Sequence, residues 1–281
     1  MTNKVNSTFV GSAKRSTALS IYYPEIKEDA PILLFAHGFK GFKDWGHFPQ
    51  IQQMFAREGF VVVAFNFSHN GGTVENPIDF PDLEAFSLNT YQKELDDIGF
   101  LLNWINSKKE TLFARTDLDE ISLLGHSRGG GIALLAAQKY AEIKKVVTWA
   151  AVADFMERLP NEMELKEWER NGVYTITNGR TKQQMPMKFD FVQNLRENVK
   201  QLSIENAVKN CPKPMLIIHG VNDETVDVEN AARIQSWSEN AQVELVENCN
   251  HTFNGKHPWN SDEVPEATIK AVKSSALFLK S

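Results

Sequence analysis

The sequence predicts an α/β protein built on an open, mostly parallel β-sheet with helices on both of its faces. Short runs of apolar residues recur along the 281-residue chain, and helical segments separate them. Continuous apolar runs are typical of parallel strands that are buried on both faces. The motif GHSRG at residues 125–129 lies between one such run and a helical segment. In sheets of this kind, ligands bind beyond the carboxyl ends of the strands.

The expected strands differ in their pattern of side chains. Residues 16–23 alternate between apolar and polar side chains, which is typical of an antiparallel strand with one solvated face. Residues 243–247 are expected to form the last strand of the sheet. Between these two segments, continuous apolar runs predict five buried parallel strands. These runs are 32–36, 61–67, 121–124, 145–151 and 215–219.

Five segments with helical patterns lie between or after these strands and are expected to cover the two faces of the sheet. They are 48–58, 91–107, 129–140, 228–238 and 265–279. The alternation of the two kinds of element is the pattern expected of right-handed strand–helix–strand units.

Residues 154–212 interrupt this alternation. The segment has no buried-strand run, but it has many charges and scattered large apolar side chains such as Phe155, Trp168 and Met187. It is much longer than an ordinary connection, and its aromatic and methionine content argues against a disordered excursion. We therefore expect a helical cap, inserted into an α/β core that comprises residues 1–153 and 213–281.

The composition is that of a globular protein, with 42% hydrophobic and 23% charged residues. A net charge of −6 argues against nucleic acid or an anionic membrane as the main partner. The first residues lack the apolar core of a signal peptide, and no apolar run approaches the ~18–20 residues of a membrane span. Cys211 and Cys249 are too few for a disulfide framework and are expected to be buried free thiols. A cytoplasmic protein is the expectation.

The GHSRG motif predicts that Ser127 is a nucleophile. A Gly-x-Ser-x-Gly elbow requires a strand before the motif and a helix after it, and residues 121–124 and 129–140 supply both. The serine backbone in such an elbow is strained, and the two glycines let neighbouring backbone approach without a Cβ clash. Because so short a pattern also arises by chance, a plain helix N-cap is the alternative role for Ser127.

A serine hydroxyl is a poor nucleophile until a base takes its proton, and the base needs an acid to orient it. After this type of elbow, the acid and then the histidine follow in chain order. Asp223 follows the strand 215–219, and His251 follows the last strand. The three candidates would thus meet at the carboxyl ends of strands of one sheet.

Other side chains compete for these roles. Asp154 follows the strand 145–151 and is the rival acid, with Glu224 a weaker one. His257 is the rival base, six residues after the favoured histidine. His69 follows another strand and could line a pocket, whereas His126 is expected to be packed or hydrogen-bonded locally.

Acyl transfer also needs hydrogen-bond donors for the developing oxyanion. The backbone N–H of Arg128 is expected to supply one of them. The second should come from the turn HGFKG at residues 37–41, where Gly38 permits close approach and the N–H of Phe39 is the best donor. The side chain of Arg128 either pairs with a carboxylate beneath the site or faces the substrate.

Together these motifs resemble the α/β-hydrolase superfamily, over nearly the whole chain. The resemblance is closest to dienelactone-hydrolase-like and cinnamoyl- or feruloyl-esterase-like members. It rests on HGFKG at 37–41, GHSRG at 125–129, HGVND at 219–223 and NHTF at 250–253. It implies that Ser127, Asp223 and His251 form a catalytic triad, with no metal or organic cofactor. Dienelactone hydrolases themselves use a cysteine nucleophile, whereas this chain has a serine.

The resulting hypothesis is a serine hydrolase that cleaves carboxylic esters through an acyl-enzyme, with small aromatic or medium acyl esters as substrates. The alternative is an amide or acyl-peptide hydrolase or a thioesterase that uses the same triad. A third hypothesis is a binding protein that retains the scaffold without activity. The expected partner is a small-molecule ester, and the exposed edges of an open sheet would allow a homodimer.

Overall fold

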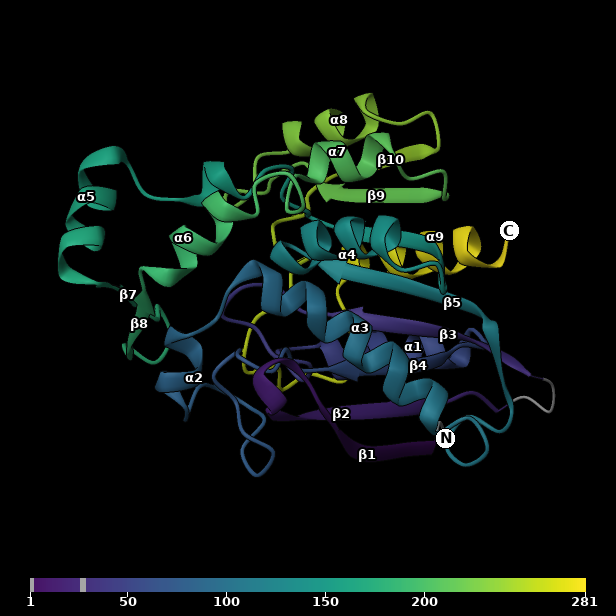
Figure 1. Cartoon of the computed structure of the whole chain (residues 1–281). Coiled ribbons are helices and arrows are strands. Elements are labelled where there is room, and N and C mark those ends of the chain that lie inside the picture. The colour runs from purple at the N-terminus through teal and green to yellow at the C-terminus, as the bar shows by residue number, and fades with distance from the viewer. Residues whose placement is uncertain (1–2, 26–28) are drawn as a thin grey trace.

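The computed structural model describes residues 3–25 and 29–281, and its centre is a β-sheet of eight strands within these residues (Figure 1). The strands are β1 (Asn3–Val10), β2 (Ser16–Tyr23), β3 (Ala30–Ala36), β4 (Val61–Phe65), β5 (Thr116–His126), β6 (Ile143–Trp149), β9 (Met215–Gly220) and β10 (Ala241–Val246). Their order across the sheet is β1-β2-β4-β3-β5-β6-β9-β10. The sheet is parallel from β4 to β10, and β1 and β2 add an antiparallel edge.

Helices cover both faces of this sheet, as expected. Helices α1 (Phe48–Arg57) and α9 (Glu266–Lys280) pack on one face and share one apolar core with it. Helices α3 (Tyr91–Ser107), α4 (Arg128–Lys139) and α8 (Glu229–Ser236) contribute to the core on the other face. Figure 1 shows α3 and α4 in front of the sheet. The α/β class with a mostly parallel sheet is therefore confirmed.

Strand β1 was not expected from the sequence. It pairs along its whole length with β2 at the edge of the sheet. Most of its side chains are exposed or half-buried, and only Phe9 is fully buried. Without an apolar face, an edge strand of this kind leaves no clear pattern in the sequence.

Residues 154–212 fold into a mixture of helices and strands. Helices α5 (Glu162–Asn171), α6 (Asp190–Glu197) and α7 (Ile204–Lys209) are accompanied by the antiparallel pair β7 (Val173–Thr177) and β8 (Gln184–Lys188). The hairpin differs from the helical segment that the sequence predicts. Figure 1 shows α5, α6, β7 and β8 gathered at one end of the main sheet.

Trp168 holds this segment together from within. Its side chain is 2% exposed, and its indole N–H donates to the carbonyl of Met187 in β8 at 2.9 Å. The ring stacks on Tyr174 with 5.1 Å between centroids. Helix α5, which carries Trp168, begins at the capping side chain of Asn161 and ends at Gly172, whose φ is 72°.

Two further expectations concern cysteines and membrane spans. Cys211 and Cys249 are buried and free, as predicted. Within residues 3–25 and 29–281, none of the helices combines the length and the apolar character needed to cross a membrane.

Candidate active site

Ser127 lies in a sharp turn between β5 and α4. Its φ of 56° and ψ of −120° are unfavourable for a residue with a side chain and cost about 1–3 kcal/mol, which the surrounding structure must offset. The Ser127 N–H donates to the carbonyl of Trp149 at the end of β6, at 2.8 Å. A Cβ atom on Gly129 would lie 2.4 Å from the carbonyl oxygen of His37, so only glycine fits where the elbow meets the end of β3.

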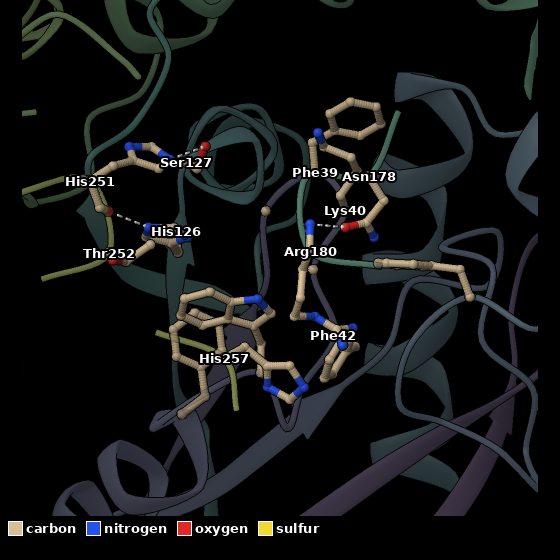
Figure 2. Close-up of a pocket in the computed structure, with 15 residues that line it drawn as sticks. Phe39, Lys40, Phe42, His126, Ser127, Asn178, Arg180, His251, Thr252 and His257 are labelled. Carbon is tan, nitrogen blue, oxygen red and sulfur yellow. Dashed lines mark hydrogen bonds between the residues drawn. The ribbon is translucent and has the colours of Figure 1, made fainter. Parts of the chain in front are cut away.

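The structure brings Ser127, His251 and Asp223 together. His251 Nε2 lies 3.0 Å from Ser127 Oγ, and His251 Nδ1 lies 2.8 Å from Asp223 Oδ2. Figure 2 shows the His251 ring directed at the serine. Asp223 follows β9 and His251 follows β10, so each of the three side chains comes from the carboxyl end of a different strand.

The Asp223 carboxylate is buried and fully bonded. Its Oδ1 accepts the N–H groups of Thr225 at 2.8 Å and Val226 at 2.9 Å. Its Oδ2 faces His251 and also His219 Nε2, at 3.2 Å. Burial alone would raise the pKa of Asp223, but hydrogen bonds from His219 and His251 outweigh it and hold the pKa well below its usual range.

These bonds decide the tautomer of His251. Because Asp223 is charged, His251 Nδ1 carries the proton and donates it to the carboxylate. The lone pair of Nε2 then faces the hydroxyl of Ser127. The sequence did not predict a role for His219, although it stands only four residues before Asp223 in the same motif.

The rival residues lie elsewhere. Asp154 accepts the N–H of Met156 at 2.7 Å and does not contact His251, while Glu224 is exposed. His257 accepts the N–H of Gly46 through Nδ1 at 2.8 Å, at the rim of the pocket in Figure 2.

Two other histidines are buried near the site. His126 Nε2 lies 2.8 Å from the carbonyl oxygen of His251 and donates to it, so His126 fixes the loop that carries the candidate base. Burial lowers the pKa of His126 to about 3, which keeps the ring neutral. His69 pairs with Ser68 Oγ at 2.8 Å and is not among the residues that line the cavities described below.

The turn at residues 37–41 passes directly over the serine. A Cβ on Gly38 would lie 2.9 Å from Ser127 Cβ. The Gly38 carbonyl accepts the Gly41 N–H at 3.1 Å and is 2.9 Å from His37 Nδ1. His37 Nε2 accepts the N–H of Phe67 at 3.2 Å, so the ring proton is on Nδ1 and is donated to Gly38. Burial lowers the pKa of His37 to about 4, and the neutral ring holds the turn in place.

The backbone N–H groups of Phe39 and Arg128 have no acceptor among the described residues. Both belong to segments packed against Ser127, and their role as oxyanion donors stays a prediction. The sequence left open whether the Arg128 side chain pairs with a carboxylate or faces the substrate. Its Nη1 lies 3.4 Å from Glu94 Oε1, and the residue also lines a cavity beside the serine.

Two cavities meet at Ser127 and His251. The small cavity, of about 250 Å³, lies between the 37–41 turn and the loop 251–257, and Figure 2 shows its lining. The large cavity, of about 380 Å³, is lined mainly by residues of the 154–212 segment, among them Phe155, Trp168 and Phe191. In the described part of the chain, no group of three or more His, Cys, Asp or Glu side chains could hold a metal ion.

Comparisons with known proteins agree with this architecture. The family model described as "Putative esterase" matches residues 11–261. Among curated proteins, no sequence matches the chain.

Solved structures give the same fold at low sequence identity. The esterase Est1E from Butyrivibrio proteoclasticus, with ferulic acid bound, has a TM-score of 0.71 at 20% identity and covers 96% of this chain and 98% of its own. An esterase domain from Rhodothermus marinus has a TM-score of 0.65 at 18% identity, with 99% and 98% of the two chains covered. A puromycin hydrolase has a TM-score of 0.67 at 15% identity and covers 99% of this chain, but only 39% of its own. The chain thus belongs to this esterase family, has the α/β-hydrolase fold and is a carboxylic ester hydrolase.

Proposed function

We propose that the chain cleaves esters through an acyl-enzyme, with Ser127 as nucleophile, His251 as base and Asp223 as the acid that orients the base. The observation that carries the proposal is the position of His251, within hydrogen-bond distance of both Ser127 Oγ and Asp223 Oδ2. The backbone strain at Ser127 supports it, because strain of this kind is retained where the surrounding structure enforces it.

In the first half of the reaction, His251 Nε2 takes the hydroxyl proton while Ser127 Oγ attacks the ester carbonyl. The N–H groups of Phe39 and Arg128 stabilise the oxyanion, since both donors lack another acceptor. His251 then passes the proton to the leaving alcohol. In the second half, His251 activates a water molecule that releases the acid, and Asp223 keeps the imidazole in the required tautomer throughout.

For the substrate, we propose small aromatic or medium acyl esters, with residues 154–212 acting as a cap on a core made of residues 1–153 and 213–281. The large cavity supports this choice, because aromatic and aliphatic side chains of the 154–212 segment form about half of its wall. The small cavity offers a second space on the other side of the nucleophile.

The first test is covalent labelling with a fluorophosphonate probe. The wild-type protein should be labelled, and Ser127→Ala should not, although its circular dichroism spectrum stays the same. Equal labelling of the wild-type and Ser127→Ala proteins would refute the assignment of the nucleophile.

The second test concerns the bond and the acyl group. We expect p-nitrophenyl esters of graded chain length, together with methyl ferulate, to show a maximum of kcat/KM at a medium or aromatic acyl group. Matched ester, thioester and anilide substrates distinguish an esterase from a thioesterase or amidase, and a higher kcat/KM on the thioester or anilide would contradict the proposal.

A further inference from the structure

The charged side chains that line the two cavities beside Ser127 are all positive. The chain has 36 acidic and 30 basic residues, yet no Asp or Glu is among the residues that line either cavity. Lys40, Arg128 and Arg158 line the large cavity, and Lys40 and Arg180 line the small one. Such a distribution of charge in an acidic protein favours an anionic ligand.

Arg128 is the most buried of these cations. Its side chain is 10% exposed, and its guanidinium carbon lies 3.8 Å from the ring centroid of Phe39, 4.9 Å from that of Tyr91 and 5.3 Å from that of Phe191. All three rings also line the large cavity. A guanidinium group has five N–H donors, and the contact with Glu94 at 3.4 Å is a long one that engages a single nitrogen.

The other two cations of the large cavity have no acidic partner. Lys40 stands in the 37–41 turn, where the two cavities adjoin, and no carboxylate of the described residues lies within ion-pair distance of it. Burial and the nearby charge of Arg128 both lower the pKa of Lys40. Within the described part of the chain, Arg158 donates only to the carbonyl of Thr225, at 3.2 Å. Among the described residues, Glu94 therefore offsets the charge of Arg128, whereas Lys40 and the solvent-exposed Arg158 have no acidic partner.

We propose that the large cavity binds a carboxylate of the substrate between Arg128 and Lys40, so that the preferred substrates are half-esters that carry a negative charge. The inference rests on the proposed function and specifies its substrate class. A planar guanidinium group can hold a carboxylate through two parallel hydrogen bonds, which are strong where water is excluded. The carboxylate can belong to the acyl part or to the alcohol part of the ester.

Two pairs of substrates test the proposal and distinguish these two positions. For the acyl part, phenyl monoadipate is compared with the phenyl ester of adipamic acid, in which a neutral amide replaces the carboxylate. For the alcohol part, 4-(butanoyloxy)phenylacetate is compared with its primary amide. We expect kcat/KM to favour the anionic member by about tenfold or more in one of the two pairs. Equal rates or a preference for the amide in both pairs would overturn the proposal.

Variants locate the anion. Lys40→Met should reduce the ratio of anionic to neutral kcat/KM at least severalfold, and so should Arg128→Gln/Glu94→Gln, which removes both charges of the buried pair. Lys182→Gln, on the exposed surface, is the matched control and should keep the wild-type ratio. A ratio that falls in Arg180→Gln but persists in the Arg128→Gln/Glu94→Gln protein would place the anion in the small cavity and refute the assignment.

The outcomes also separate this inference from the proposed function. If the neutral esters are hydrolysed and Ser127→Ala abolishes that hydrolysis, the proposed function holds whatever the charge preference is. If Ser127→Ala retains hydrolysis, the proposed function is refuted, independently of the charge preference.

Discussion

The proton on His251 is held in place by a single carboxylate. Asp223 accepts four hydrogen-bond contacts from its surroundings, and the contact with His251 Nδ1 is among the shortest of them. The remaining contacts keep Asp223 charged, so Nδ1 of the imidazole carries the proton. Nε2 therefore presents its lone pair to Ser127. In the proposed reaction, the carboxylate of Asp223 is therefore required to keep the His251 imidazole in the tautomer that can accept the serine proton.

Replacing Asp223 by Asn tests this role directly. The amide can donate to His251 Nδ1, so Nε2 would carry the proton and could not accept one from Ser127. We expect kcat on p-nitrophenyl butyrate to fall by about 10³- to 10⁴-fold while the fold is retained. Asp154→Asn is the matched control and should keep kcat within about twofold, and a larger loss in that variant would show that the acid has been misassigned.

The sequence was sufficient to find residues that lie within a motif, but not their partners. Ser127, Asp223 and His251 each follow a predicted strand, so their meeting at one edge of the sheet could be expected. Glu94, which contacts Arg128, stands on α3, and nothing in its neighbourhood marks it as part of the site. Its contact depends on how α3 packs beside α4, which a single sequence does not specify.

At the scale of elements, the elbow depends on how closely the start of α4 approaches the end of β3. Gly129→Ala would place a Cβ against the carbonyl oxygens of His37 and Ala36, at 2.4 Å and 2.8 Å. Since both are backbone atoms, the helix must shift and carry the Arg128 N–H away from its proposed position beside the oxyanion. We expect a loss of about 1–3 kcal/mol in the free energy of unfolding, measured with urea, together with a lower kcat.

Gly179→Ala is the control for that substitution, because a Cβ at this position would meet no atom within 4 Å. It should leave both the unfolding free energy and kcat close to the wild-type values. A Gly129→Ala protein as stable and as active as Gly179→Ala would show that the close approach is not required.

The elements of the core were easier to predict than those of residues 154–212, for a physical reason. Core strands such as β4 are buried on both faces and therefore consist entirely of apolar residues. The side chains of β7 alternate between exposed and half-buried, and β8 contains Pro186. Strands of a small hairpin with one solvated face resemble loops in sequence, so the segment reads as irregular or helical.

At the scale of the whole molecule, the interior contains several histidines that must stay neutral. Burial lowers the pKa of His37, His47 and His69 to about 4, and that of His126 to about 3. In the unfolded chain these rings titrate near 6.5, so the unfolded state takes up protons first as the pH falls. The contribution of the four neutral histidines to the free energy of unfolding is therefore fully present above about pH 6.5. It is lost progressively as the pH falls toward 4.

Two buried carboxyl groups have the opposite effect on the pH dependence of stability. Burial raises the pKa of Asp97 to about 6 and also raises the pKa of Glu94, so the native state binds these protons before the unfolded state does. The four histidines outnumber them, and the net effect of acidification between pH 6.5 and 4 should be destabilising. Urea unfolding at pH 8, 6 and 5 should show a free energy that falls by up to about 1.4 kcal/mol per pH unit for each net proton taken up. His69→Asn removes one of the four rings and should reduce this slope. A free energy of unfolding that stays constant or rises as the pH falls would show that the buried histidines do not govern acid stability.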